Sequence, residues 1–466
     1  MIPQRLFQAP LSIIVLLHVV GTQAIASDTT DTTSYICQPV DMPSSSHFLG
    51  FSAPSDATKW MEAQRTVCEG KLVLLHKVFT AVKRIQDLYS PDRAFRWNHH
   101  LADVFLINGM DFDAVNQFTN KSRAPIVHFG KRTFERENYK GPLKSWNAFS
   151  PHNVADFSGR LPRKIVAIGA MDENWGWLST NFLNRTVSWG LRLTKQNNKF
   201  PQDVMQNFLD DPNLLMLVVN QHNNVSHPKV ISMPLGVASP KPLAAAARRL
   251  LAGGDSTAPP SRKLTLLMTG GSNYGARPAI RDCVDKNMKG KMEILTSRMP
   301  EPMFFAKMGR SVAVLCMPGL GYDTYRLWET LVMGAIPVIE RGLGLDRTLY
   351  KLPALIVDDF AEVTPEVIRS AYVEAVYRAD EWEYERLTIS FWRNLIRRVA
   401  DEQSTGPLLQ AFPEKTIITD FTRPLFPFDC DKVGGCGRGT KRTPRKYCGI
   451  DTSRDWNKYV FGHFNR

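Results

Sequence analysis

The chain is poor in cysteine and in long apolar runs, and each scarcity excludes a class of protein. Its 466 residues include 7 cysteines, too few for a small scaffold held together by disulfides, so an ordinary hydrophobic core must stabilise it. A membrane-spanning helix needs about 20 consecutive apolar residues, but the apolar run from Leu11 to Val20 is interrupted by His18 and ends at Gly21. No other segment is long and apolar enough to span a bilayer, which argues against a protein with several membrane spans.

The N-terminus has the pattern of a secretory signal peptide. Arg5 precedes the apolar run, and Ala24-Ile-Ala26 stands before Ser27 as a small-residue cleavage site. We therefore expect the chain in the secretory pathway, in the lumen of the Golgi or the endoplasmic reticulum, or secreted. The alternative is an uncleaved signal anchor, which would associate the chain with a membrane. Three N-x-S/T triplets agree with a lumenal chain and are candidate glycosylation sites: Asn120, Asn184 and Asn224.

The chain has fewer acidic residues than basic residues. There are 45 Asp and Glu against 58 Lys and Arg, a formal net charge of +13. Such an excess favours anionic partners such as nucleotide-sugar diphosphates, acidic glycans or membrane surfaces. Part of it lies in residues 432–446, where interleaved Gly and Thr predict a solvated basic tail; polyanion binding by this tail is a further hypothesis. Nucleic acid is not an expected partner, because the chain has an export signal and no recognisable nucleic-acid-binding motif.

The odd number of cysteines leaves at least one thiol unpaired or bridging to another chain. Cys37 and Cys68 are close in sequence, whereas three others crowd the C-terminus. The spacing of those three, Cys430, Cys436 and Cys448, matches no familiar zinc finger. Cys316 falls in an apolar run, where a free cysteine is most simply a small buried apolar residue.

Changes in composition divide the chain into segments. We predict a signal peptide or short signal anchor at 1–26, a flexible stem rich in Ser and Thr at 27–56, an N-terminal domain at 57–250, a turn-rich linker at 251–262, a C-terminal domain at 263–400 and a basic extension with cysteines at 401–466. Helical spacing of apolar residues predicts one long amphipathic helix over 57–89.

Short apolar runs alternate with mixed segments in both domains, which predicts two doubly wound α/β domains. The predicted strands are, in the first domain, 104–107, 126–129, 165–168, 214–219 and 230–233, and, in the second, 264–268, 291–295, 312–316, 336–339 and 355–357.

The most informative stretch is 312–338, which predicts a buried strand, a glycine turn at Gly319 and Gly321, a short helix and a second strand. We expect Asp323 to cap this helix and Gly334 to end it. A glycine turn that leads into a helix N-terminus gathers N–H donors and suits a phosphate.

Arg326 and Glu329 are three residues apart and share one face of this helix. They can supply a cation for a diphosphate and a carboxylate for sugar hydroxyls. On the other interpretation, the segment is an ordinary strand–helix–strand crossover whose Arg and Glu pair on the surface.

The motif Pro318-Gly-x-Gly-x-Asp-x-x-Arg326-x-x-Glu329, followed by Gly334-Ala-Ile-Pro-Val338, resembles the donor-binding core of exostosin-type glycosyltransferases. Further matching pieces extend the resemblance in collinear order over about residues 100 to 400. They are Glu173-Asn-Trp-Gly176, Asn184-Arg-Thr186, His227-Pro-Lys-Val-Ile-Ser-Met-Pro-Leu-Gly236, Arg277-Pro278 and Leu352-Pro-x-Leu-Ile-Val-Asp-Asp359.

The resemblance implies a GT-B-like fold, with two Rossmann-like domains facing a cleft, and a lumenal transferase that takes sugar from a nucleotide donor. Relatives of similar pattern imply UDP as the nucleotide and a glycan or glycoprotein as the acceptor. The N-terminal domain would bind the acceptor and the C-terminal domain the donor. The residues we expect at the donor are Arg277, Gly319, Gly321, Tyr322, Asp323, Arg326, Glu329 and Glu340, with Glu329 on the ribose and Glu340 facing the sugar.

We expect no metal ion and no cofactor beyond the nucleotide sugar as co-substrate. Two Asp-x-Asp triplets begin at Asp111 and Asp429, but neither lies in the matched donor core. For the general base we predict Glu173 or Asp172, which follow the strand 165–168 at the carboxyl edge of the first sheet, where open α/β sheets bind ligands.

Two alternatives stay open. The carboxylates of Asp172 and Glu173 can instead cap the helix that follows them. The chain can also be a catalytically inactive glycan-binding protein of the same fold, because a fold does not fix a function.

Overall fold

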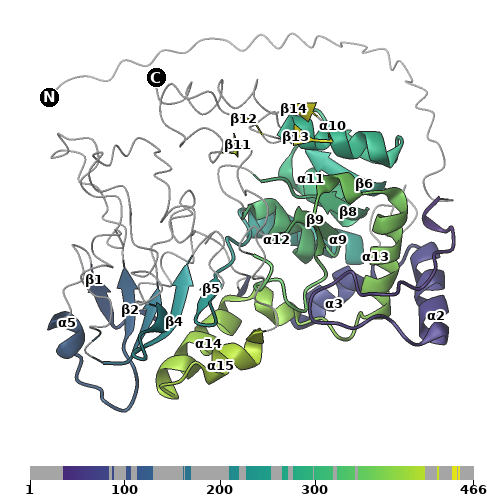
Figure 1. Cartoon of the computed structure of the whole chain (residues 1–466). Helices are drawn as coiled ribbons and strands as arrows, with labels where there is room; N and C mark the ends of the chain where they lie inside the picture. Colours follow the sequence, from purple (N-terminus) through teal and green to yellow (C-terminus); the bar gives the residue numbers. More distant parts are fainter. Residues whose placement is uncertain are drawn as a thin grey trace, which may run out of the picture. The chain divides into compact units, whose positions relative to one another are not determined.

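The structure is a computed structural model. It describes residues 35–82, 87–88, 101–106, 113–129, 161, 163–168, 209–219, 227–252, 265–270, 277–297, 299–318, 323–341, 345–414, 428–429, 443–444, 446–448 and 450–451. These residues include two five-stranded parallel sheets, the second with helices between most of its strands, which confirms the predicted α/β class (Figure 1).

The first sheet is built from runs that the sequence shows as continuous apolar segments. Its strands, in the order β1-β2-β3-β4-β5, are β1 (Val104–Leu106), β2 (Ile126–Phe129), β3 (Ile165–Ile168), β4 (Leu214–Val219) and β5 (Val230–Ser232). All neighbours pair in parallel. The short helix α5 (Asp113–Asn116) follows β1. The strand order runs in one direction through these described strands.

The second sheet has the reversal expected of a doubly wound sheet. Its order is β10-β9-β8-β6-β7, again parallel, with β6 (Thr265–Gly270), β7 (Met292–Leu295), β8 (Ser311–Leu315), β9 (Ile336–Glu340) and β10 (Leu355–Val357). From β6 the chain goes first to β7 on one side and then to β8 on the other. The switch point of this sheet therefore lies between β6 and β8.

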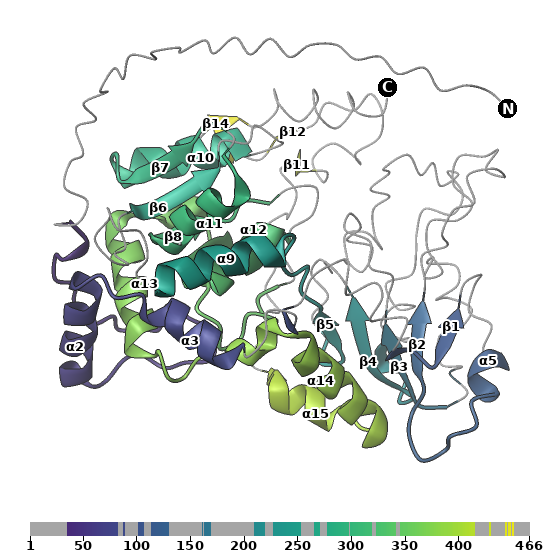
Figure 2. The same cartoon turned by 180° about the vertical axis from the view of Figure 1, so that it is seen from behind.

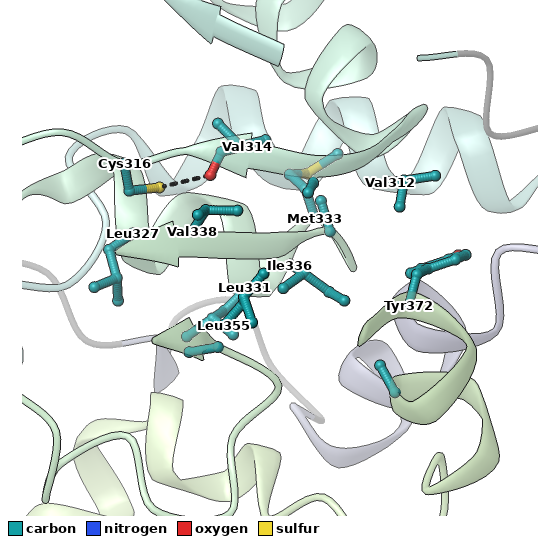
Figure 3. Packing of buried hydrophobic residues seen from close by; sticks show 14 of the residues in the cluster. Val312, Val314, Cys316, Leu327, Leu331, Met333, Ile336, Val338, Leu355 and Tyr372 are labelled. Carbon is teal, nitrogen blue, oxygen red and sulfur yellow. Dashed lines mark hydrogen bonds between the residues drawn. The ribbon is translucent and has the colours of Figure 1, made fainter. Parts of the chain in front are cut away.

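Helices pack around the second sheet and form with it one hydrophobic cluster, called the second core below (Figure 2). They are α9 (Pro240–Leu251), α10 (Arg277–Met288), α11 (Glu301–Gly309), α12 (Tyr325–Val332), the 3-10 turn η3 (Phe360–Glu362) and α13 (Pro365–Tyr377). Figure 3 shows part of this cluster: Leu327 and Leu331, four apart on one face of α12, lie near Val338 of β9.

Helix α9 precedes the predicted linker at 251–262 in sequence, but it already packs on the second core. Leu243, Ala247 and Leu250 of α9 belong to the same buried cluster as the second sheet. The passage from the first sheet to the second core is therefore the segment between β5 and α9, residues 233–239. Apolar spacing in α9 predicted a helix, but it did not show which core the helix packs on.

The N-terminal helices also belong to the second core. Instead of one helix over 57–89 there are two, α2 (Ala57–Cys68) and α3 (Val73–Ala81). Gly70, with φ of 73°, turns the chain between them. Trp60 and Leu75 are buried in the second core, with α2 against α13 and α3 against α12. This differs from their predicted place in the N-terminal domain.

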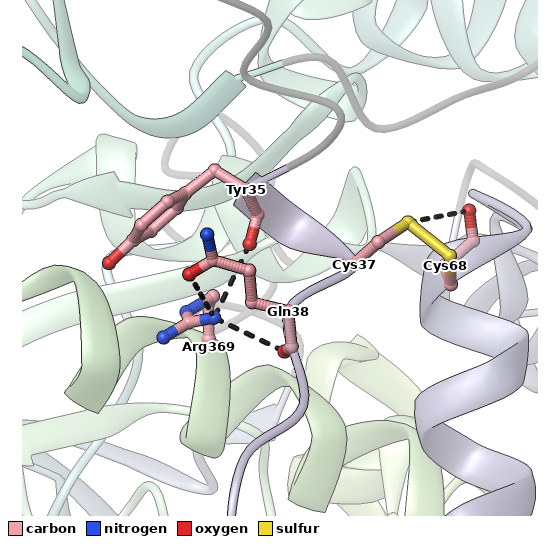
Figure 4. Close-up of a disulfide and its surroundings, with 5 residues drawn as sticks. All are labelled: Tyr35, Cys37, Gln38, Cys68 and Arg369. Atoms are coloured by element: carbon pink, nitrogen blue, oxygen red, sulfur yellow. Dashed lines mark hydrogen bonds between the residues drawn. A yellow bond between two sulfur atoms is a disulfide. The ribbon is translucent and has the colours of Figure 1, made fainter.

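The segment before α2 is packed, which corrects the prediction of a flexible stem for residues 35–56. Ile36 and Phe48 are buried in the second core. Arg369 of α13 donates to the carbonyl oxygens of Tyr35 (3.4 Å) and Gln38 (3.1 Å), and its guanidinium carbon lies 4.4 Å from the centre of the Tyr35 ring. A disulfide joins Cys37 to Cys68 at the end of α2 (Figure 4).

After α13 the chain returns to the first sheet. The 3-10 turn η4 (Tyr384–Leu387) leads into α14 (Ile389–Asp401) and α15 (Gly406–Ala411). Trp392 and Ile396 of α14 share a buried cluster with Val166 and Val218 of β3 and β4.

Part of the C-terminal extension is fixed to the second core. The strands β11 (Phe428–Asp429) and β12 (Thr443–Pro444) pair, as do β13 (Lys446–Tyr447) and β14 (Ile450–Asp451). Cys448 forms a disulfide with Cys283 of α10, so it is not a zinc ligand.

Cys316 is a buried free thiol, as predicted. Within the described ranges no helix is long and apolar enough to cross a membrane.

Candidate functional site

The carboxyl ends of β6 and β8 meet at the switch point of the second sheet, the place where such sheets bind ligands. Arg277 begins α10 after β6, and Pro318 follows β8. Arg277 Nε donates to the carbonyl oxygen of Pro318 at 2.9 Å. The two motifs that the sequence analysis singled out separately are therefore joined here. Gly319, Gly321 and Tyr322 lie outside the described residues.

Asp323 does not cap α12, and this prediction was wrong. The helix begins after Thr324, whose side chain makes no capping bond. Asp323 is only 3% exposed: one carboxylate oxygen accepts the N–H of Leu235 and the other accepts Nε1–H of Trp328, both at 2.6 Å. Burial raises the pKa of Asp323 to about 7, against the opposing effect of its N–H donors. Asp323 thus ties α12 to the segment 233–239 rather than facing a ligand.

Gly334 ends α12 as predicted. Its φ of 66° lies in the left-handed region that glycine adopts without strain. The position is also crowded, because a Cβ there would overlap the backbone of Leu75 in α3. The glycine therefore allows α3 to approach the turn between α12 and β9.

Arg326 and Glu329 form an ion pair on α12, with 3.1 Å between Nη1 and Oε2. The Glu329 side chain is 5% exposed, whereas that of Arg326 is 36% exposed. Glu329 also accepts the backbone N–H of Ala238. The pair is therefore not the simple surface pair of the alternative interpretation, because its carboxylate is buried and fixed by a second element.

The electrostatics of the pair follow from this burial. Desolvation raises the pKa of Glu329, and the Arg326 charge opposes the shift; desolvation lowers the pKa of Arg326, and Glu329 opposes it. Nη1 of Arg326 is buried and makes no hydrogen bond of proper geometry in the described part of the chain. The exposed fraction of the side chain therefore belongs to its other atoms. A partly exposed arginine pinned by a buried carboxylate is suited to an anionic ligand.

Glu340 ends β9, beside β8, and so lies at the same carboxyl edge of the sheet. Its side chain is buried, with 3% exposure. The structure thus brings Arg277, Arg326, Glu329 and Glu340 to one edge from three elements, α10, α12 and β9.

Other predicted site residues are not tested by the described residues. Asp172 and Glu173 lie outside them, as do Asn184 and Asn224. Asn120 is exposed, and its Oδ1 accepts hydrogen bonds from the backbone N–H (3.0 Å) and the hydroxyl (2.6 Å) of Ser122. Among the residues with assigned positions, no group of three or more His, Cys, Asp or Glu side chains is arranged to hold a metal ion.

Two contributors to the site were missed by sequence reasoning. Phe304 of α11 lies under Arg326, with 4.0 Å from the ring centre to the guanidinium carbon. The segment 233–239 supplies the N–H groups that bind Asp323 and Glu329. The His227–Gly236 motif pointed to part of this segment, but nothing in the sequence linked it to α12.

No model of a protein family matches this chain, and no curated protein matches its sequence. Among solved structures the chain is similar to a UDP-forming α,α-trehalose-phosphate synthase from Burkholderia vietnamiensis, with 11% identity, 75% of this chain and 86% of that chain covered, and a TM-score of 0.32. A synthase from Burkholderia xenovorans has 10% identity, coverage of 78% and 87% and a TM-score of 0.25. The same type of synthase from that organism, in complex with glucose-6-phosphate, has 11% identity, coverage of 77% and 85% and a TM-score of 0.25. Likenesses this weak carry no conclusion about this chain.

Proposed function

We propose that this chain is a glycosyltransferase of GT-B type that takes a sugar from a UDP-sugar donor. The observation that carries the proposal is the carboxyl edge of the second sheet, where the partly exposed Arg326 is pinned by the buried Glu329 and Arg277 begins α10 after β6. The resemblance of residues 318–338 to the exostosin-type donor core supports the same assignment.

The chemistry of transfer explains why such a site is needed. When the glycosidic bond to the donor breaks, negative charge develops on the leaving diphosphate. Arg326 and Arg277, with the backbone N–H groups of residues 319–322, would neutralise this charge, and Glu329 would accept hydrogen bonds from the ribose hydroxyls.

On the acceptor side, a carboxylate would take the proton of the attacking hydroxyl. Asp172 or Glu173 of the N-terminal domain is proposed for this role, with a glycan or glycoprotein as acceptor. We place the reaction in the lumen of the secretory pathway, from the signal-like N-terminus and the three glycosylation triplets.

Calorimetric titration of UDP into the purified full chain tests the donor site. Arg326→Ala should weaken UDP binding at least about tenfold, since a charge-assisted contact to phosphate is lost. The matched control is Arg398→Ala: Arg398 also pairs with a helical glutamate, Glu402, but it is 54% exposed and lies on α14. This control should bind UDP like the wild type.

The outcomes distinguish a glycosyltransferase from a catalytically inactive glycan-binding protein. A wild-type chain that binds neither UDP nor any other nucleoside diphosphate contradicts the donor site and favours a glycan-binding protein. If UDP binds, a panel of UDP-sugars is tested with glycan acceptors by following the release of UDP. Near-normal turnover in Arg326→Ala would contradict the role given to that residue.

A further inference from the structure

Phe304 lies on the first turn of α11, the helix that precedes β8. It is partly buried and packs against the second core, with its ring edge-on to Phe305 at 5.9 Å between centroids. Its face is turned to Arg326 of α12, whose guanidinium carbon lies 4.0 Å from the ring centre. A long polar side chain of one helix is thus placed on an aromatic ring of another.

Arg326 is therefore held from two directions by different interactions. Glu329 fixes the Nη1 end of the guanidinium through charge, at 3.1 Å. The ring of Phe304 supplies a negative face, and an arginine stacked on an aromatic ring is held with its planar group parallel or inclined to it. Together the two contacts remove rotamer freedom that a free arginine loses only when its ligand binds.

The elements that supply these contacts are themselves linked. Ser239 Oγ donates to Glu301 Oε1 at 3.0 Å, which joins the start of α11 to the end of the segment 233–239. The N–H of Ala238 in that segment bonds to Glu329. The ring of Phe304 and the carboxylate of Glu329 are therefore set by one connected group of residues.

We propose that Phe304 is a positioning residue for the diphosphate of the donor, acting by holding the Arg326 guanidinium on its ring so that the N–H groups of Arg326 are oriented before the ligand arrives. This inference rests on the proposed function of the site. It assigns Phe304 no contact with the substrate.

The test is a substitution series at Phe304 with UDP and uridine as probes, in the full chain. Phe304→Leu keeps an apolar side chain but removes the aromatic face, and it should weaken UDP binding about three- to tenfold. Uridine, which has no phosphate, should bind as it does to the wild type. Phe304→Tyr retains the ring and should restore UDP affinity to near the wild-type value.

Phe51→Leu is the matched control. Phe51 is also partly buried in the second core and also lies under an arginine, Arg378, at 4.6 Å, but it is outside the site. This variant should leave UDP affinity unchanged, which separates loss of an aromatic–arginine contact in general from loss of the one at Arg326.

A second readout needs no ligand. Phenylglyoxal labels arginine side chains, and mass spectrometry of the Arg326 peptide gives its rate of labelling. The rate should rise several-fold in Phe304→Leu and stay at the wild-type level in Phe304→Tyr and Phe51→Leu.

Each contrary outcome has a distinct meaning. UDP binding that is lost in Arg326→Ala but unchanged in Phe304→Leu overturns the positioning role alone. An equal loss for uridine and UDP, or a failure of tyrosine to restore binding, also overturns it, because either result points to general damage. Absence of UDP binding by the wild-type chain overturns both this inference and the proposed function.

Discussion

Replacing Gly334 by alanine tests the packing of helix α3 against the turn between α12 and β9. Gly334 has a φ of 66°, and an alanine held in the left-handed region costs about 1–2 kcal/mol. Its Cβ would also overlap the backbone of Leu75, and forced overpacking of this kind costs about 1–3 kcal/mol. We expect Gly334→Ala to lower the free energy of unfolding by about 2–5 kcal/mol.

Gly290→Ala separates these two contributions. Gly290 also has a positive φ, 76°, but a Cβ there meets nothing within 4 Å, so this variant should lose only the backbone contribution of about 1–2 kcal/mol. Urea unfolding followed by tryptophan fluorescence measures both variants, since Trp328 is buried in the second core at 2% exposure. Equal losses in the two variants would refute the close contact between α3 and the turn at Gly334.

Two further predictions concern the links that hold the second core together. Because the pKa of Asp323 is raised from 3.8 to about 7 in the folded chain, its protonated form favours folding. Stability should therefore fall as the pH rises from about 4 to about 7, by at most about 1.4 kcal/mol per pH unit. Asp323→Asn, which cannot ionise, should show a flatter urea-unfolding profile over this range, and an identical slope in both proteins would contradict the assignment. Replacing Cys37 and Cys68 together by serine opens a link between residues 31 apart in sequence, and loop-closure entropy predicts a loss of about 3–4 kcal/mol in the free energy of unfolding. The comparison is made with the oxidised wild-type protein, because reduction would also open the Cys283–Cys448 disulfide. An unchanged free energy of unfolding in the double variant would contradict this prediction.

The sheets and helix α12 could be predicted from the sequence because their signals are local. Strands buried on both faces of a parallel sheet appear as continuous apolar runs, so those of β3, β8 and β9 were found close to their true positions. The left-handed turn at Gly334 was predicted for the same reason, since only the backbone of that residue demands it. The pairing of Arg326 with Glu329 also follows from spacing along one helix.

The wrong predictions share one physical cause, which is that residues distant in sequence compete for the same contacts. Asp323 has the residue type and position of a helix cap, but the N–H groups of Leu235 and Trp328 bind its carboxylate instead. Helical spacing could not show that α2, α3 and α9 pack on the second core, because an apolar helix face does not show which element packs against it.

The sequence by itself therefore determined the α/β class, the strands, the turn at Gly334 and the residue types at the candidate site. Tertiary structure alone decided where the chain passes between its two cores, which residues hold Asp323, and that Phe304 lies under Arg326. The first set depends on interactions within a few residues of the chain. The second depends on contacts made only when distant elements pack, and these leave no periodic pattern in the sequence.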